Sequence, residues 1–73
     1  MAATKNATPR SFSPERMERF RERKSLTRRS LSGLVNVTEQ TLYSWGTGKT
    51  IPNADQTSAL AQALGVDLDD LFE

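Results

Sequence analysis

One local pattern occurs four times in this 73-residue chain and constrains its fold more than any other feature. Each time, an apolar residue precedes a residue that can cap a helix, and a second apolar residue follows five positions after the first. Such a pair packs over the first helical turn as a hydrophobic staple, while the capping oxygen accepts a free backbone N–H. The pattern therefore predicts four helix starts. The four pairs are Phe12 and Met17, Leu26 and Leu31, Val37 and Leu42, and Val66 and Leu71, with caps at Ser13, Thr27, Thr38 and Asp67.

A further helix is predicted to start at Asn53, where Gln56 completes a capping box. Its apolar stripe includes Leu60 and Leu64, and Gly65 stands where a left-handed residue would end it. No segment shows the strict alternation of a β-strand. The sequence therefore predicts an all-α fold, a compact domain of five short helices. The expected helices are residues 14–23, 28–35, 39–45, 54–64 and 68–72.

Composition excludes several classes of function. The chain has no cysteine and no histidine, so it cannot form a disulfide, a Ser-His-Asp triad or a histidine-ligated metal site. We interpret Asp67, Asp69 and Asp70 as a helix cap and helix N-terminal charge rather than as metal ligands. No apolar run approaches the roughly 20 residues that cross a bilayer, and residues 1–14 lack the apolar stretch of a signal peptide. We expect a cytoplasmic binding module that is not an enzyme, has no cofactor or metal and contacts no membrane.

Charge and periodicity divide the chain. Residues 1–29 carry nine basic and three acidic residues, a net charge of +6, whereas residues 30–73 carry one basic and six acidic residues, a net charge of −5. The basic half favours a polyanionic partner, although uneven charge also arises by chance in small domains. Residues 1–12 have no periodicity and are predicted to form a flexible arm before a single domain at residues 13–73.

The connection between the second and third predicted helices is short. It consists of Asn36, Val37 and the cap Thr38. Asn tolerates the left-handed conformation, so Asn36 can end a helix sharply, and the staple between Val37 and Leu42 fixes a steep angle between the two helices. This geometry is a helix-turn-helix, whose second helix enters the major groove of DNA. The core-facing residues predicted for the two helices are Leu31, Leu34, Val35, Leu42 and Trp45.

The stretch from Ser25 to Pro52 resembles the Cro/lambda-repressor type of helix-turn-helix, the XRE-like group. Its most specific parts are the helix-turn-helix core, the exit Trp45…Gly48-Lys49…Pro52 and the segment Leu-Ala-Gln-Ala-Leu-Gly-Val at 60–66. The resemblance covers roughly residues 14–73. It implies a sequence-specific regulator of transcription, a repressor, that binds double-stranded DNA as a homodimer on an inverted repeat in the nucleoid of a bacterial or phage-infected cell.

Four positions depart from the pattern of that family. Arg28 stands where the family usually has Gln, Ser32 replaces its small Ala, Asn36 replaces its turn Gly, and Gly46 replaces its Glu after the aromatic residue. Arg28 suits a phosphate contact and Asn36 suits the turn. Gly46 is expected to loosen the end of the third helix, because glycine costs up to about 1 kcal/mol relative to alanine in a helix.

The resemblance and the helical spacing place the same residues at the DNA. Leu42 and Trp45 must face inward, which leaves the other positions of the third helix outward. Gln40 can pair with adenine N6 and N7, and Glu39 can accept from cytosine N4 or reject wrong sequences. The predicted base contacts are Glu39, Gln40, Tyr43 and Ser44, with Thr41 nearby. The predicted phosphate contacts are Arg28, Thr38, Lys49 and Thr50, and Lys5 and Arg10 are candidate contacts from the arm.

The C-terminal apolar residues have two interpretations. Leu68, Leu71 and Phe72 either cap the core or form part of a two-fold interface, and we expect at least one of them at the interface, because a single small module rarely reaches useful specificity. The regulator would block a promoter or contact RNA polymerase through its acidic surface. An alternative function is a protein-interaction module, antitoxin-like or anti-repressor, whose acidic C-terminal half binds another protein. An RNA-binding adaptor is less favoured, because Tyr43 is the only exposed aromatic residue that we expect.

Overall fold

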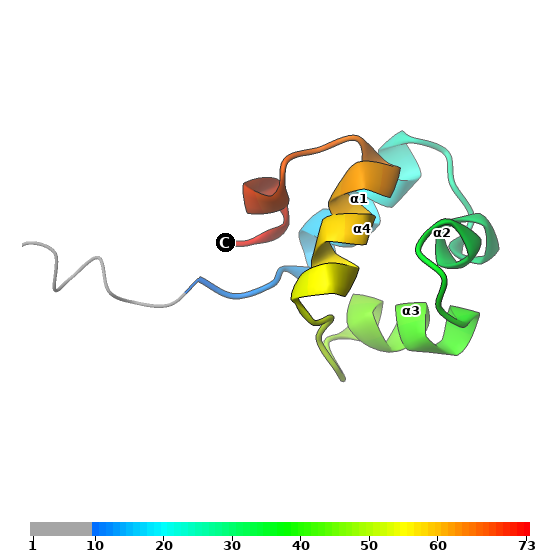
Figure 1. The fold of residues 1–73 in the computed structure, drawn as a ribbon, viewed down its shortest axis with the longest axis horizontal. Helices are drawn as coiled ribbons and strands as arrows, with labels where there is room; N and C mark the ends of the chain where they lie inside the picture. Colours follow the sequence, from blue (N-terminus) through cyan, green and yellow to red (C-terminus); the bar gives the residue numbers. More distant parts are fainter. Residues whose placement is uncertain (1–9) are drawn as a thin grey trace, which may run out of the picture.

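The computed structural model describes residues 10–73 and contains four α-helices and one 3-10 turn (Figure 1). This confirms the all-α class, and no residue in that range belongs to a named strand. None of the helices described is long and apolar enough to cross a bilayer. The elements are α1 Pro14–Arg23, α2 Arg28–Leu34, α3 Glu39–Thr47, α4 Ala54–Leu64 and η2 Leu68–Leu71.

The predicted count of five helices is not confirmed, because the last segment is a single 3-10 turn. The Asp70 N–H donates to the carbonyl of Asp67 at 3.0 Å, and the Phe72 N–H donates to that of Asp69 at 3.1 Å, so both bonds span three residues. Phe72 is already extended, with φ −118° and ψ 150°. Its pairing with Phe12 as an antiparallel bridge prevents the turn from continuing as a helix.

Side-chain caps begin the helices at the predicted positions. The hydroxyl of Ser13 accepts the Arg16 N–H at 3.2 Å at the start of α1. At α4, the Gln56 N–H donates to the side chain of Asn53 at 2.8 Å, and the Asn53 N–H donates back to the Gln56 side chain at 2.9 Å. Each bond satisfies an otherwise unpaired donor of the first turn. Thr27 and Thr38 cap α2 and α3 through the backbone of Ser30 and Thr41, each at 3.0 Å.

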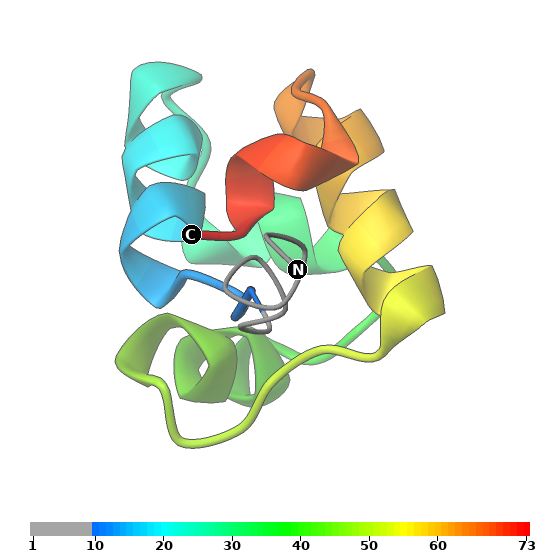
Figure 2. The same ribbon diagram turned by 90° about the vertical axis from the view of Figure 1, so that its left-hand side faces the viewer.

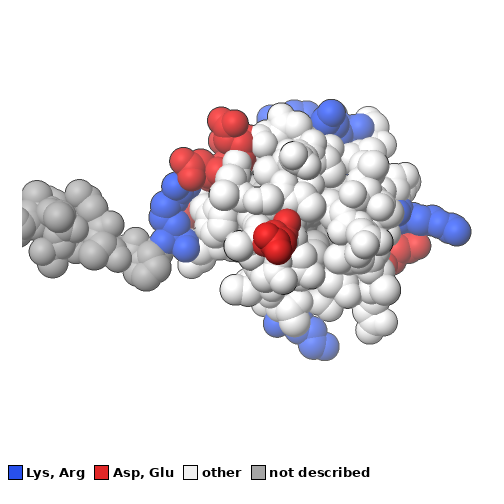
Figure 3. Space-filling model, viewed as in Figure 1, with Lys and Arg blue, Asp and Glu red and all other residues white. Residues whose placement is uncertain are grey.

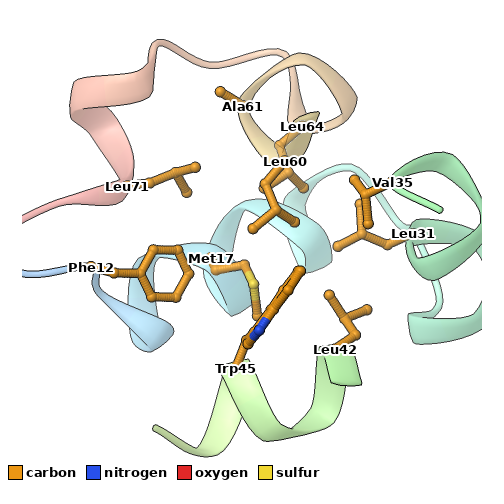
Figure 4. Close-up of a cluster of buried hydrophobic side chains, with 10 residues drawn as sticks. All are labelled: Phe12, Met17, Leu31, Val35, Leu42, Trp45, Leu60, Ala61, Leu64 and Leu71. Atoms are coloured by element: carbon orange, nitrogen blue, oxygen red, sulfur yellow. The ribbon is translucent and has the colours of Figure 1, made fainter. Parts of the chain in front are cut away.

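The second residue of every staple lies in the core (Figure 4). Met17, Leu31, Leu42 and Leu71 are all 0% exposed, so the four helix starts also supply the centre of the fold. In Figure 4, Trp45 and Leu42 project from α3 into this cluster. The remaining buried apolar residues are Phe12, Val35, Trp45, Leu60, Ala61 and Leu64.

The prediction that Leu34 faces the core is wrong. Its side chain is 61% exposed, whereas Leu31 and Val35 on the same helix are buried. Residues advance by about 100° around a helix, so Leu31 and Val35 share one direction and Leu34 is rotated to the far side of Leu31. On that side no element of the described chain covers it.

The N- and C-terminal segments lie side by side (Figure 2). The backbone of Ser11 exchanges hydrogen bonds with that of Glu73, at 3.3 Å and 3.0 Å. The rings of Phe12 and Phe72 meet edge to face with centroids 6.3 Å apart. Residues 10–12, which the sequence assigns to the arm, therefore pack on the domain. Residues 1–9 of the predicted arm lie outside the described residues.

Candidate nucleic-acid interface

The turn between α2 and α3 has the geometry that the sequence predicts. Asn36 adopts the left-handed conformation with φ 60°. The Val37 N–H then donates to the carbonyl of Ser32 at 3.0 Å, which closes the end of α2. Val37 is partly buried against the core, so the connection is fixed on both sides before Thr38 starts α3.

Helix α3 has one buried face and one exposed face. Leu42 and Trp45 are 0% and 2% exposed and attach the helix to the core. Glu39, Gln40 and Tyr43 are exposed on the other face. In Figure 1, α3 lies along the lower side of the molecule. The predicted separation of core residues from candidate base contacts is therefore present in the structure.

Two other predicted base contacts are less accessible. Thr41 and Ser44 are both partly buried. The hydroxyl of Thr38 donates to that of Thr41 at 2.9 Å and also accepts the Thr41 N–H at 3.0 Å. The two threonine hydroxyls are thus engaged with the first turn of α3. Their hydrogen-bonding capacity is partly used within the protein.

Gly46 does not loosen the end of α3, contrary to the expectation from its low helix propensity. The helix continues through Gly46 to Thr47 and ends at Gly48, whose φ of 81° is left-handed. The N–H groups of Lys49 and Thr50 then donate to the carbonyl of Ser44 at 2.9 Å and 3.3 Å. Both residues are exposed, and their backbone is fixed just beyond the end of the helix.

Arg28 lies where the start of α2 meets α3. Its guanidinium carbon is 5.4 Å from the centre of the Tyr43 ring, within the range of a cation–π contact. Its Nε is 4.0 Å from an oxygen of Glu18 on α1. Another ion pair joins α2 to α3, since Arg29 Nε is 4.0 Å from a Glu39 oxygen. Predicted phosphate and base contacts are therefore neighbours in space.

Sequence reasoning missed the role of Glu18 in this arrangement. Glutamates on a charged helix such as α1 usually face solvent, yet the side chain of Glu18 is 21% exposed and that of Arg21 only 12%. One Glu18 oxygen accepts from Arg21 Nη2 at 2.7 Å and from Nε at 2.9 Å. The unusual Gly46 is the feature of the sequence that indicates this site.

The C-terminal segment, rather than a free arm, holds Arg10. Its guanidinium donates to the carbonyls of Asp69 at 2.9 Å and Phe72 at 3.2 Å, and lies 3.3 Å from the carboxylate of Asp69. These bonds compete with any contact from Arg10 to DNA. Lys5, the other candidate arm contact, lies outside the described residues.

The predicted dimer surface is smaller than expected. Leu71 is 0% exposed, so its place is in the core and not at an interface. Phe72 is partly buried against the core, in edge-to-face contact with Phe12. Leu68 remains, at 46% exposure, and lies between Asp67 and Asp69. Of the three residues proposed for an interface, only Leu68 has a largely free side chain.

The basic residues do not form one continuous patch on the face shown in Figure 3. Lys and Arg side chains lie at separate points around the outline, with mostly uncharged surface between them. Such an arrangement supports separate phosphate contacts better than a broad cationic surface. The 3-10 turn η2, whose sequence includes Asp69 and Asp70, lies at the left of the domain in Figure 1, away from α3.

Comparison with family models identifies the family of this chain. The sequence model of a family described as helix-turn-helix matches residues 17–71. The P22 c2 repressor protein, crystallised with synthetic operator 9T in the presence of Tl⁺, is similar with a TM-score of 0.78 and 26% sequence identity; the match covers 84% of this chain and 92% of that chain. No curated protein matches the sequence.

A second solved structure shares the fold alone. It is Co(II) HppE in complex with its substrate, with a TM-score of 0.76 and 23% identity. The match covers 82% of this chain but 34% of the HppE chain, so it concerns one part of a larger protein. The fold therefore occurs within proteins of different function.

Proposed function

Because the chain belongs to the helix-turn-helix family of the Cro/lambda-repressor type, we propose that it is a transcriptional regulator that binds specific sequences of double-stranded DNA. The observation that carries the proposal is the division of α3, with Leu42 and Trp45 buried while Gln40 and Tyr43 face solvent. An α-helix presented in this way fits the major groove. The resemblance to the P22 c2 repressor, which was crystallised with an operator, supports the same proposal.

The exposed side chains of α3 would specify the sequence. Gln40 offers an amide that can form two hydrogen bonds with adenine N6 and N7, and Glu39 can accept from cytosine N4. Glu39 lies 4.0 Å from Arg29, which reduces the repulsion between its carboxylate and nearby phosphates. Tyr43 supplies an apolar ring beside them, and Thr41 and Ser44 would contribute less, because both are partly buried.

Phosphate contacts would fix the position of α3 in the groove. Arg28 stands at the N-terminus of α2, where its own charge adds to the partial positive charge of the helix end. Lys49 and Thr50 flank the other end of α3, with their backbone fixed by the Ser44 carbonyl. Thr38, the N-cap of α3, would complete the set once its hydroxyl proton turns from Thr41 to a phosphate. These residues would bind the sugar-phosphate backbone of DNA whatever its base sequence.

The protein would regulate transcription by occupying its DNA site. We propose that two copies bind an inverted repeat with half-sites about one helical turn apart, and repress transcription by blocking a promoter. A different function, a protein-interaction module, has one specific observation in its favour: Leu68 is exposed next to the acidic residues Asp69 and Asp70. The charge of that surface would suit a basic partner.

Selection from a random pool of duplex DNA, at about 0.15 M salt, tests the proposal. The purified protein should enrich one inverted repeat, and the symmetry and spacing of the repeat would report the arrangement of the two copies. A variant that carries Gln40→Ala serves as the comparison and should enrich a site with one relaxed base position. Enrichment of no sequence, with binding that disappears as salt rises, would contradict a sequence-specific function and direct attention to a protein partner.

A further inference from the structure

We propose that Glu18 is a positioning residue of the DNA-contacting surface, which holds Arg28 across the ring of Tyr43, and that residue 46 is glycine because Glu18 occupies the space of its side chain. The effect of the Arg28 position on DNA affinity rests on the proposed function. Its structural part concerns α1, α2 and α3 alone. Neither Glu18 nor Gly46 contacts DNA in this proposal.

Hydrogen bonds to Arg21 hold Glu18 in place. One of its oxygens accepts two hydrogen bonds from Arg21, at 2.7 Å and 2.9 Å. Arg21 is fixed in turn, because its Nη1 donates to the carbonyl of Leu26 at 2.6 Å. Both side chains are mostly buried. Hydrogen bonds between charged groups in such a site are stronger than those on an open surface.

The other oxygen of Glu18 faces Arg28. The distance from this oxygen to Arg28 Nε is 4.0 Å, and the guanidinium of Arg28 lies over the Tyr43 ring at 5.4 Å. Contact with both the carboxylate and the ring restricts the directions in which the Arg28 side chain can extend. A side chain that is already ordered loses less conformational entropy when it binds a phosphate.

The same oxygen of Glu18 closely approaches Gly46. A Cβ atom at residue 46 would overlap the second oxygen of Glu18 and would lie 3.3 Å from its Cδ and 3.6 Å from its Cγ. The overlapping atom is the end of a flexible side chain, and turning it away would disturb the bonds between this carboxylate and Arg21. Glycine at this place in a helix is unfavourable in itself, so the space that it leaves for Glu18 accounts for its presence.

Nuclear magnetic resonance tests the position of Arg28 without DNA. In the unmodified protein, the Tyr43 ring should displace the Arg28 side-chain proton signals from their values in an unstructured peptide. Glu18→Gln keeps the shape of the side chain and removes its charge, and the displacement should fall by about half or more. The matched control is Glu22→Gln, because Glu22 is 72% exposed and lies 4.0 Å from Arg21; it should leave the Arg28 signals unchanged. Unchanged signals in Glu18→Gln would overturn the proposal.

A double-mutant cycle measures the consequence for DNA affinity. On the duplex enriched by selection, Glu18→Gln should weaken binding about two- to fivefold, the range expected for a partly exposed ion pair. Added to Arg28→Ala, it should weaken binding no further, because its effect passes through Arg28. Independent, multiplied losses would overturn the proposal. If the unmodified protein enriches no duplex, the proposed function fails, and the magnetic resonance result alone decides the position of Arg28.

Unfolding in urea tests the role of Gly46. Gly46→Ala should lower the unfolding midpoint of the unmodified protein although alanine is the better helix former. In a Glu18→Ala background the same change should raise the midpoint, because the obstruction is absent. Circular dichroism confirms that each variant is folded before the comparison. A Gly46→Ala change that raises the midpoint in both backgrounds would show that Glu18 does not determine the residue at this position.

Discussion

Gln40 is the residue of α3 whose substitution should change sequence preference. It is exposed, so Gln40→Ala should leave the free energy of unfolding nearly unchanged. We expect a loss of about 1–3 kcal/mol on the selected duplex and relaxed preference at one base pair. Fluorescence anisotropy titrations with duplexes altered one base pair at a time measure both effects. Gln62→Ala, an exposed glutamine on α4, is the control. Equal losses on all duplexes would contradict a base contact by Gln40.

Lys49 should affect all sequences alike. Its backbone is fixed beyond the end of α3, and its side chain is exposed, as a phosphate contact requires. We expect Lys49→Ala to weaken binding to every duplex by the same factor and to reduce the slope of log affinity against log salt by about one. Lys24→Ala at the end of α1 should leave the slope unchanged. A variant at Lys49 with altered base preference but the original slope would be inconsistent with a phosphate contact.

At the scale of the element, the turn between α2 and α3 depends on a left-handed residue. Asn36 has φ 60°, where a Cβ atom is strained but the asparagine side chain is tolerated. Asn36→Ala should lower the free energy of unfolding by about 1 kcal/mol, whereas Asn36→Gly should change it by only a few tenths. Urea denaturation provides the measurement. Ser25→Gly is the control for a left-handed residue outside this turn, since Ser25 has φ 59° just after α1. Like Asn36→Gly, it should change the free energy of unfolding by only a few tenths of a kcal/mol. Equal stability of the alanine and glycine variants at residue 36 would exclude this account of the turn.

Local chemistry made most of the elements predictable. The caps Ser13, Thr27 and Thr38 act within four residues of sequence, so the pattern of caps and staples contains the information that determines each helix start. The turn at Asn36 was predictable for the same reason. The second residue of each of the four staples also lies in the centre of the core. The local signals that start the helices therefore agree with the overall fold.

The features that could not be predicted depend on contacts between elements. The carboxylate of Glu18 lies beside Gly46 on another helix, and nothing local to α1 distinguishes it from a solvated glutamate. The exposure of Leu34 depends on which side of α2 the other helices leave open. The end of η2 depends on the pairing of Phe72 with Phe12, sixty residues away along the chain. Sequence spacing contains none of this information.

At the scale of the whole molecule, the two ends of the described chain form a clasp between residues 10–13 and 72–73. Ser13 donates to the Glu73 carboxylate at 2.7 Å, and Arg16 donates to the Phe72 carbonyl at 2.6 Å. Phe72→Ala should therefore lower the free energy of unfolding by about 1–2 kcal/mol, less than for a fully buried ring. A single unfolding transition, the same by fluorescence of Trp45 and by circular dichroism, would show that the clasp unfolds with the core. A separate early transition would contradict this.

Association of two copies is the property that the charge of the whole molecule should control. A two-fold contact through Leu68 would bring Asp67 and Asp69 of both copies close together, and like charges repel at low salt. We therefore expect monomers in free solution at low salt, weak association as salt rises, and two copies on an inverted repeat, where DNA holds them together. Leu68→Ala should stay folded, since the side chain is 46% exposed, and should bind single half-sites normally while losing cooperativity on the repeat. Sedimentation velocity and stoichiometric titration measure these states. Stable dimers at low salt, or full cooperativity in Leu68→Ala, would place the contact between copies on another surface.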